Sequence, residues 1–240
     1  MNDRAAIDRQ VWVVTGTSRG LGRSIADYLL EKGHVVVGCS RGAGPISDGN
    51  YHHFIVDATD ENQVRAWARE IRARFQKVDV LVCNVGLVKS ALLLSLTPLE
   101  VYRSMLETNL TSTFLVCREF SKMMVQRKMG RIINISSAMT AWHEPGTAVY
   151  SASKSAVIEL SKVMAKELAP MNITCNVVSP GLIKTETSDA MGEDWRKRIM
   201  LKQTVSREIK ISEIGHTLEF LGSPEAACIS GQVIHLGLVY

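Results

Sequence analysis

Short runs of consecutive hydrophobic residues alternate along this chain with longer amphipathic stretches. The short runs are rich in β-branched residues, and they predict strands at residues 11–14, 35–39, 53–56, 80–83, 131–135, 174–178 and 232–235. The longer stretches predict helices near residues 21–31, 61–75, 99–128, 148–168 and 211–221.

The order of these elements predicts the fold class. Strands that are hydrophobic along nearly their whole length suit a sheet covered by helices on both faces. Strands separated by helices imply right-handed βαβ crossovers and therefore a parallel sheet. We predict an α/β fold, a doubly wound parallel sheet (Rossmann fold) of about seven strands, with ligands at the carboxyl ends of the strands.

The residues that follow the predicted strands support a ligand site at this edge of the sheet. They are small, polar or turn-forming almost throughout: Thr15-Gly16, Ser40-Arg41, Asp57-Ala58, Asn84-Val85-Gly86, Ser136-Ser137 and Ser179-Pro180-Gly181. Residues of this kind can line a crevice for a polar cofactor.

Length and composition place these elements in one soluble unit. The chain has 240 residues, 46% of them hydrophobic, and no Pro/Gly/Ser-rich linker, so we expect a single domain over residues 1–240. The charged N-terminus lacks the apolar stretch of a signal peptide, and no apolar run approaches the ~18 residues of a membrane span. We therefore expect a cytoplasmic protein that does not bind membranes.

Charge and cysteine usage exclude other classes. The net charge of +4 is spread along the chain, which argues against a nucleic-acid partner. The five cysteines are scattered and form no Cys-x-x-Cys pair. This pattern predicts buried free thiols in a reducing compartment rather than disulfides or a metal site.

Three glycines, Gly16, Gly20 and Gly22, follow the first strand and open the first predicted helix. In a dinucleotide site the strand must turn sharply here, its backbone must approach a pyrophosphate, and the helix must pack closely on the sheet. Each requirement is easiest to meet without a Cβ. The helix N-terminus offers unpaired N–H groups to phosphates. A second strand about twenty residues later favours a dinucleotide site over an ordinary glycine-rich turn. The predicted contacts in this turn also include Ser18, Arg19 and Leu21.

The second strand ends at Ser40-Arg41, where an NAD site usually carries an acidic side chain for the ribose hydroxyls. Arg41, together with Arg19 from the glycine turn, would pair with a 2′-phosphate. The absence of a carboxylate therefore favours NADP(H). The alternative is that Arg41 is a solvated loop arginine.

Further cofactor contacts are expected after the third and fourth strands. Asp57, followed by Ala58, would accept from the adenine amino group or cap a helix. Asn84 and Gly86 would contact the adenosine half, although a plain strand-to-helix turn explains them as well.

Tyr150 and Lys154 are four residues apart, so on a helix they share one face. A phenol titrates near ~10 in water, and a neighbouring ammonium and an oxidised nicotinamide would lower its pKa towards that of a general acid/base. Ser137, at the end of the fifth strand, would hydrogen-bond a substrate oxygen. Asn109 lies in a long helical stretch, where its side chain or a local kink would hold water and extend a proton relay to Lys154. Each residue alone has an ordinary structural explanation, but their joint order points to chemistry.

In these motifs the chain resembles the short-chain dehydrogenase/reductase family, over essentially residues 8–236. The resemblance is carried by Thr15-Gly16-x-x-x-Gly20-x-Gly22, Asn84-x-Gly86, Asn109, Ser137, Tyr150-x-x-x-Lys154, Asn176-x-x-Ser179-Pro180-Gly181 and Thr185.

The resemblance implies a catalytic tetrad of Asn109, Ser137, Tyr150 and Lys154, with Tyr150 as the acid/base. It also implies that Lys154 holds the nicotinamide ribose. The cofactor set then includes Tyr150 and Lys154 with Pro180, Gly181, Ile183 and Thr185, of which Ile183 and Thr185 orient the carboxamide. Family members are commonly tetramers built on two long helices, here residues 99–128 and 148–168, so we expect a homotetramer or homodimer.

Within that family the chain looks most like the 3-oxoacyl-[acyl-carrier-protein] reductases, through residues 130–137, 172–174 and 230–232. This implies NADPH-dependent reduction of a 3-oxoacyl thioester, linked to acyl carrier protein or CoA, in fatty acid or polyketide biosynthesis. The basic residues Arg127, Lys128 and Arg131 would meet an acidic carrier protein, or form a solvated helix end.

Several positions depart from these reductases. Met171 stands where they often have a basic residue, Cys83 and Val85 differ from their Asn-Asn-Ala-Gly, and the C-terminus lacks Asp/Asn-Gly-Gly. Trp142 and His143 in loop 139–147, with Trp195, are therefore expected to shape a different substrate pocket. Residues 182–205 have the amphipathic spacing of a lid that closes over an acyl chain, or of ordinary core packing.

Two other functions remain open from the sequence. One is an NAD(P)-dependent dehydrogenase of a secondary alcohol, a sugar or a steroid. The other is a non-catalytic dinucleotide-sensing protein, against which the intact tetrad argues.

Overall fold

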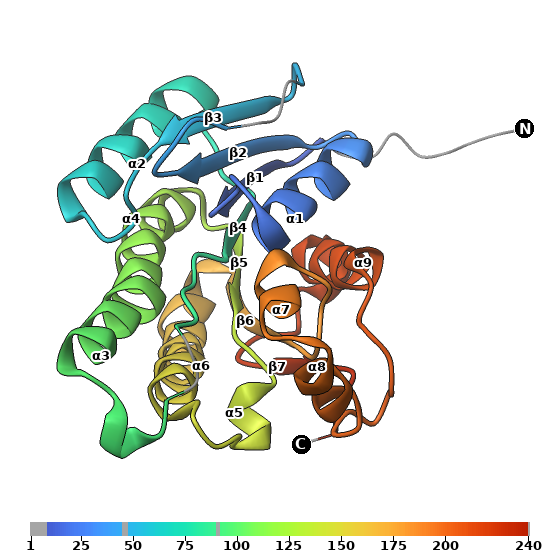
Figure 1. Cartoon of the computed structure of the whole chain (residues 1–240). Coiled ribbons are helices and arrows are strands. Elements are labelled where there is room, and N and C mark those ends of the chain that lie inside the picture. Colours follow the sequence, from blue (N-terminus) through green and yellow to red (C-terminus); the bar gives the residue numbers. More distant parts are fainter. Residues whose placement is uncertain (1–8, 45–47, 90–91, 240) are drawn as a thin grey trace, which may run out of the picture.

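The computed structural model describes residues 9–44, 48–89 and 92–239 and forms a parallel sheet flanked by helices (Figure 1). The strand order is β3-β2-β1-β4-β5-β6-β7, and every neighbouring pair is parallel. The strands are β1 (Val11–Thr15), β2 (Val35–Ser40), β3 (Tyr51–Ile55), β4 (Val80–Cys83), β5 (Gly130–Ile135), β6 (Ile173–Pro180) and β7 (Val233–Leu236). The predicted doubly wound fold is confirmed.

The helices cover both faces of this sheet. Helices α2, α4 and α6 pack on one face, and α1 and α9 pack on the other (Figure 1). The α-helices are α1 (Gly20–Glu31), α2 (Glu61–Phe75), α3 (Leu99–Leu106), α4 (Ser112–Arg127), α5 (Met139–Trp142), α6 (Ala148–Leu168), α7 (Glu186–Ala190), α8 (Glu193–Met200) and α9 (Ile211–Gly222). Shorter turns of helix are η1 (Leu94–Leu96), the π-helical η2 (Glu107–Thr111), η3 (Ala169–Met171) and η4 (Pro224–Ala226).

Strand β1 shows how the continuous hydrophobic runs supply two cores. Successive side chains of a strand point to opposite faces, so Val11 and Val13 join the core under α2, α4 and α6. Trp12 and Val14 join the core under α1 and α9. A strand in the middle of a covered sheet needs hydrophobic residues at every position, as this sequence has.

The carboxyl ends of β1 and β4 are fastened together. Thr15 Oγ1 accepts from the backbone N–H of Asn84 at 3.0 Å and of Val85 at 3.1 Å. The Asn84 side-chain amide donates to the Thr15 carbonyl at 3.0 Å. These bonds fix the segment after β4 against the segment after β1, which is where a ligand site is expected.

The predicted helix at residues 99–128 is wrong as one regular helix. It is α3, the π-helical turn η2 and α4 in succession, with Asn109 buried inside η2. The sequence analysis allowed for a local kink at Asn109, and the π-helical turn is the form that this irregularity takes. The predicted third strand at 53–56 lies at 51–55 instead, and the helices α5, α7 and α8 were not predicted as separate elements.

The cysteines are free thiols. Cys39, Cys83, Cys117 and Cys175 are buried and Cys228 is exposed. None of the helices in the described ranges is both long and apolar enough to cross a membrane.

Candidate active site

The glycine turn after β1 brings two backbone segments into close contact. Gly16 and Gly20 have φ angles of +76° and +58°, which favour glycine. At Gly22, a Cβ would lie 2.3 Å from the Gly16 carbonyl oxygen and 2.4 Å from Asn84 Nδ2. Arg19, the residue before α1, makes no capping hydrogen bond with its side chain. The backbone N–H groups of the first helical turn are therefore not capped by this residue.

The ends of β2 and β3 lie beside this turn in the sheet. Ser40 ends β2, and both Arg41 and Arg19 have exposed side chains. Asp57 accepts from the N–H and hydroxyl of Thr59 at 3.0 and 2.8 Å. It does not cap helix α2, because that role belongs to Asp60, which accepts from the N–H groups of Asn62 and Gln63.

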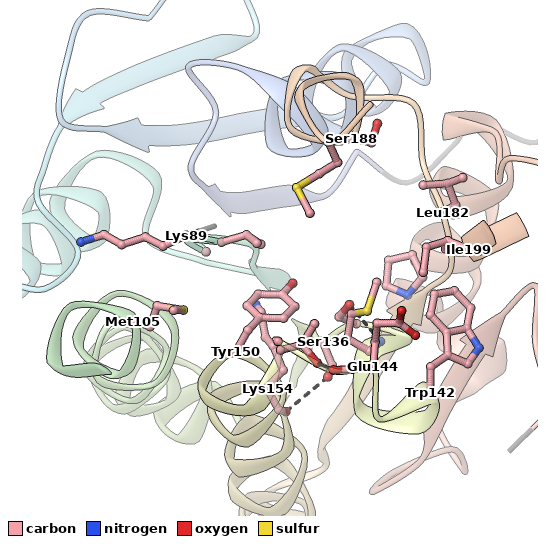
Figure 2. A pocket seen from close by; sticks show the side chains of 18 of the residues that line it. Lys89, Met105, Ser136, Trp142, Glu144, Tyr150, Lys154, Leu182, Ser188 and Ile199 are labelled. Carbon is pink, nitrogen blue, oxygen red and sulfur yellow. Dashed lines mark hydrogen bonds between the residues drawn. The ribbon is translucent and has the colours of Figure 1, made fainter. Parts of the chain in front are cut away.

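A cavity of about 290 Å³ opens at the carboxyl edge of the sheet, beyond the glycine turn (Figure 2). Many residues singled out in the sequence line it: Leu21, Asn84, Gly86, Ser137, Trp142, Tyr150, Lys154, Pro180, Gly181, Ile183, Thr185 and Trp195. The other predicted cofactor residues, which do not line this cavity, follow β1, β2 and β3 along the same edge: Gly16, Ser18, Arg19, Gly20, Gly22, Ser40, Arg41, Asp57 and Ala58.

Tyr150 points from α6 into this cavity (Figure 2). Its neighbour Ser137 follows β5, and the Ser137 side-chain oxygen accepts from the Met139 N–H at 3.3 Å. Burial raises the pKa of Tyr150, and a hydrogen bond with Ser137 opposes this increase. This direction is opposite to the lowered pKa that the sequence predicts from the Lys154 ammonium and an oxidised nicotinamide. Among the groups of the chain itself burial dominates, so the phenol carries its proton at neutral pH.

Lys154 is buried one helical turn from Tyr150. Its Nζ donates to the Ile135 carbonyl at 2.9 Å, and its own carbonyl accepts from Ser136 Oγ at 3.2 Å. Burial lowers the pKa of Lys154 to about 8, and Cys83 opposes this decrease. A lysine of this kind changes its charge close to neutral pH.

Asn109 anchors the segment after β4 from inside the π-turn. Its side chain pairs with the Leu87 peptide, since Oδ1 accepts from the N–H at 2.6 Å and Nδ2 donates to the carbonyl at 3.1 Å. Nδ2 also donates to Ser153 Oγ at 2.9 Å. A Cβ on Gly86 would lie 3.2 Å from Lys154 Nζ and 3.7 Å from Asn109 Oδ1. Asn109 is thus close to Lys154, and its part in a proton relay stays a prediction.

The remaining wall of the cavity is largely apolar. Trp142 projects from the segment after β5, and Leu182 and Ile199 lie on the same side of the cavity, across from Tyr150 (Figure 2). Other apolar lining residues are Val101, Met105, Met139, Pro145, Val149 and Met191. Such a surface suits an aliphatic chain better than a sugar.

His143 does not belong to this wall. The side chain is exposed, and the cavity lining passes from Trp142 to Glu144. The backbone at His143 has a φ of +52° and ends helix α5. The predicted pocket-lining position is therefore wrong for His143, which lies outside the cavity lining.

Glu144 is a cavity residue that sequence analysis missed. Its side chain is only 7% exposed and pairs with Arg198 of α8 at 3.1 Å and with Lys202 just beyond α8. These pairs join loop 139–147 to the segment at 182–205. The sequence offered little to find it, because a single acidic residue beside Pro145 resembles any surface loop. The contribution of α3 was also missed, since Val101 and Met105 look like core residues.

Two of the three basic residues proposed for a carrier protein have other partners. Arg131 is buried and donates to the carbonyls of Gly130 and Asn172 at 2.9 and 3.4 Å. Arg127 pairs with Asp79 at 3.2 Å. The expectation of a basic surface cluster is therefore wrong for Arg131, while Lys128 is exposed at the end of α4.

The residues at the edge of the sheet fit a dinucleotide with an extra phosphate. The close approach of Gly16 and Gly22 and the uncapped start of α1 suit a pyrophosphate. Ser40 with the two exposed arginines suits a 2′-phosphate better than free ribose hydroxyls.

Comparisons with known proteins agree with this arrangement. The sequence profile of the family described as short chain dehydrogenase matches residues 10–196. The 3-oxoacyl-[acyl-carrier-protein] reductase FabG of Escherichia coli (strain K12) is 36% identical over 233 residues, covering 95% of each chain. FabG of Staphylococcus aureus (strain Mu50 / ATCC 700699) is 34% identical, covering 93% of this chain and 95% of that relative.

Among solved structures, ElxO with NADP bound has a TM-score of 0.88 and 28% sequence identity, covering 95% of this chain and 97% of ElxO. A tyrosine-to-phenylalanine variant of ElxO with NADPH bound has the same TM-score and 27% identity, covering 95% and 96% of the two chains.

Proposed function

Because this chain belongs to the short-chain dehydrogenase family of oxidoreductases, we propose that it reduces the 3-oxo group of an acyl thioester with NADPH. The observation that carries the proposal is the meeting of Tyr150, Ser137 and Lys154 at one cavity whose far wall is apolar. The product is the 3-hydroxyacyl thioester.

The residues that follow β1 and β2 favour NADPH as the cofactor. The residues that would hold it are the glycine turn at the pyrophosphate, and Ser40, Arg41 and Arg19 at the 2′-phosphate. NADP and NADPH are also the ligands of the ElxO structures. When bound, NADPH supplies the hydride that reduces the carbonyl carbon.

The residues of the chain supply the proton and fix the geometry. Tyr150 is protonated at neutral pH, so it donates its phenolic proton to the oxygen of the substrate as negative charge develops there. Ser137 donates a hydrogen bond to the same oxygen. Lys154 holds a positive charge one turn from Tyr150, and Asn109 keeps the segment beside Lys154 in place.

The apolar wall supports an aliphatic acyl chain as the substrate. Trp142, Leu182 and Ile199 give this part of the cavity an apolar surface that an acyl chain can contact. The relatives named 3-oxoacyl-[acyl-carrier-protein] reductases favour a carrier-protein thioester, and a CoA thioester presents the same reacting group. We also propose that the protein is a homotetramer or homodimer.

The test follows NADPH absorbance with acetoacetyl thioesters of CoA and of an acyl carrier protein. The wild type should consume NADPH, and Tyr150→Phe should lower kcat by roughly 10²–10⁴-fold, because it removes the proton donor. The affinity of Tyr150→Phe for NADPH, measured by fluorescence, should stay close to that of the wild type.

The matched control is Tyr102→Phe, because Tyr102 is exposed on α3 and outside the cavity. This variant should keep full activity. Absence of turnover by the wild type on every 3-oxoacyl thioester, with turnover on secondary alcohols and NAD, would contradict the proposal.

A further inference from the structure

A histidine of strand β3 lies against the loop that follows β2. His53 Nε2 is 2.8 Å from the Gly42 carbonyl oxygen and 3.1 Å from Ser40 Oγ. A carbonyl oxygen only accepts, so Nε2 carries a proton and donates to it. A Cβ on Gly44 would lie 2.5 Å from the His53 ring, so the loop passes directly over the imidazole.

The other ring nitrogen of His53 continues a chain of hydrogen bonds to the glycine turn. His53 Nδ1 is 2.7 Å from the Tyr51 hydroxyl, which is 2.7 Å from Thr17 Oγ1. Thr17 directly follows Gly16. Three side chains therefore connect the segment after β1 with the segment after β2, the two places that hold the pyrophosphate and the 2′-phosphate in the proposed function.

The hydrogen bonds between Thr17, Tyr51 and His53 pass across strand β2 at Gly38. A Cβ on Gly38 would lie 2.3 Å from the Tyr51 hydroxyl and 2.4 Å from Thr17 Oγ1. A side chain at this position would break the contact between Tyr51 and Thr17. The bond chain and the space that it needs are thus both present in the structure.

From this geometry we infer that His53 is a positioning residue for the 2′-phosphate of NADPH, acting through Ser40 and the Gly42 carbonyl. The Gly42 carbonyl accepts from Ser40 Oγ at 2.8 Å as well as from His53. His53 keeps this carbonyl bonded when the Ser40 hydroxyl rotates towards a phosphate. The inference rests on the proposed use of NADPH and adds a residue beyond Ser40 and the arginines.

The test measures dissociation constants of NADPH and NADH by fluorescence for the wild type and a set of variants. His53→Leu removes the hydrogen bonds of both ring nitrogens, to the Gly42 carbonyl and Ser40 on one side and to Tyr51 on the other. Tyr51→Phe removes only the part of the network that connects His53 to Thr17. His53→Gln keeps an N–H donor at the end of a side chain of similar reach. The matched control is His52→Leu, because His52 lies on the same strand and packs against the Phe75 ring instead, at 5.0 Å between centroids.

His53→Leu should weaken NADPH binding roughly tenfold while changing NADH binding less than about twofold. His53→Gln should restore most of the preference, Tyr51→Phe should lose part of it, and His52→Leu should leave it intact. A purely structural role would weaken both cofactors equally.

Two results overturn the inference and are distinguishable. If the wild type prefers NADPH and both His53→Leu and Tyr51→Phe retain the full NADPH-to-NADH ratio, or lower both affinities equally, His53 has no such role and the proposed function stands. If the wild type binds both cofactors equally, the NADPH assignment in the proposed function fails and the role of His53 fails with it.

Discussion

Lys154 shows at the scale of one residue how burial prepares a side chain for chemistry. A charged ammonium inside the protein costs free energy, and this lowers the pKa of Lys154 to about 8. Burial raises the pKa of the neighbouring Tyr150, so the phenol stays protonated at neutral pH. At neutral pH the pair is a protonated phenol and an ammonium one helical turn apart, which is the state that the proposed carbonyl reduction needs.

The first prediction concerns the pH dependence of reduction. The rate constant kcat/KM for NADPH reports groups of the free enzyme, so it should fall above pH about 8, approaching tenfold per unit, as Lys154 loses its proton. Initial rates between pH about 6 and 10 measure this. Lys154→Arg, whose charge does not titrate in this range, should show lower activity without the decline, and a wild-type profile that is flat beyond pH about 9 would contradict the assignment.

The second prediction concerns stability. The pKa of Lys154 falls from 10.5 to about 8 on folding, so the unfolded chain binds more protons between these values. The cost of burying the charge is therefore complete below pH about 8 and disappears as pH rises through about 10.5. The full pKa shift of Lys154 corresponds to roughly 3 kcal/mol of lost stability at pH 7. The loss of the hydrogen bond to the Ile135 carbonyl, which the substitution of Lys154 also removes, offsets part of the gain from removing the charge. Lys154→Met should therefore raise the free energy of unfolding by roughly 2 kcal/mol at pH 7.

Urea unfolding of Lys154→Met at pH 7 and pH 10 tests this, with Lys162→Met as the control. Lys162 lies on the exposed side of the same helix, where it pairs with Glu159. A gain in stability that is as large at pH 10 as at pH 7 would show that the charge is not its cause.

At the scale of elements, the cavity is formed by segments that are far apart in sequence. Helix α6 carries Tyr150 and Lys154, loop 139–147 carries Trp142, and α7 and α8 form the wall opposite (Figure 2). Glu144 ties the loop to α8 through Arg198 and Lys202. The proposed lid at 182–205 is thereby fastened to the segment that follows Ser137.

The third prediction is that Glu144→Gln loosens this connection. A neutral amide of the same shape loses the attraction to Arg198 and Lys202, so KM for the acyl thioester should rise several-fold, about 3 to 10 times, with a smaller change in kcat. Because both cations are partly exposed, the free energy of unfolding should fall by only about 1 kcal/mol.

Glu193→Gln is the matched control for Glu144→Gln. Glu193 pairs with Lys197 on the exposed side of α8, so its loss should leave both KM and stability unchanged. An unchanged KM in Glu144→Gln would mean that the ion pairs do not position the lid.

At the scale of the whole molecule, several large apolar side chains stay exposed on α3, α4 and α6. Tyr102, Phe114 and Val163 are 44%, 44% and 54% exposed. A surface of this kind on the two helical segments expected to form an interface is consistent with self-association.

The fourth prediction is that Phe114→Glu combined with Val163→Glu lowers the mass measured by light scattering in solution. Charges at the centre of an interface cost several kcal/mol when buried, so the assembly should dissociate to smaller species. Ile55→Glu, which changes an exposed residue on the edge strand β3, should leave the mass unchanged. A wild type that is already monomeric would contradict the expected oligomer.

The sequence by itself determined the fold class and many of the residues that line the candidate site, because both depend on local signals. Continuous hydrophobic runs and the helices between them identified a covered parallel sheet, and the spacing of Tyr150 and Lys154 on one helix brought them together without any tertiary information. The glycine turn after β1 was readable for the same reason, since its glycines are required by the backbone.

Only the tertiary structure decided how these parts are joined. The π-turn at Asn109, the pairing of Glu144 with α8, the outward turn at His143 and the burial of Arg131 each depend on residues distant in sequence. The pKa of Tyr150 likewise depends on how much water reaches the phenol. Burial and long-range pairing arise from packing of the whole chain, so no local pattern contains them.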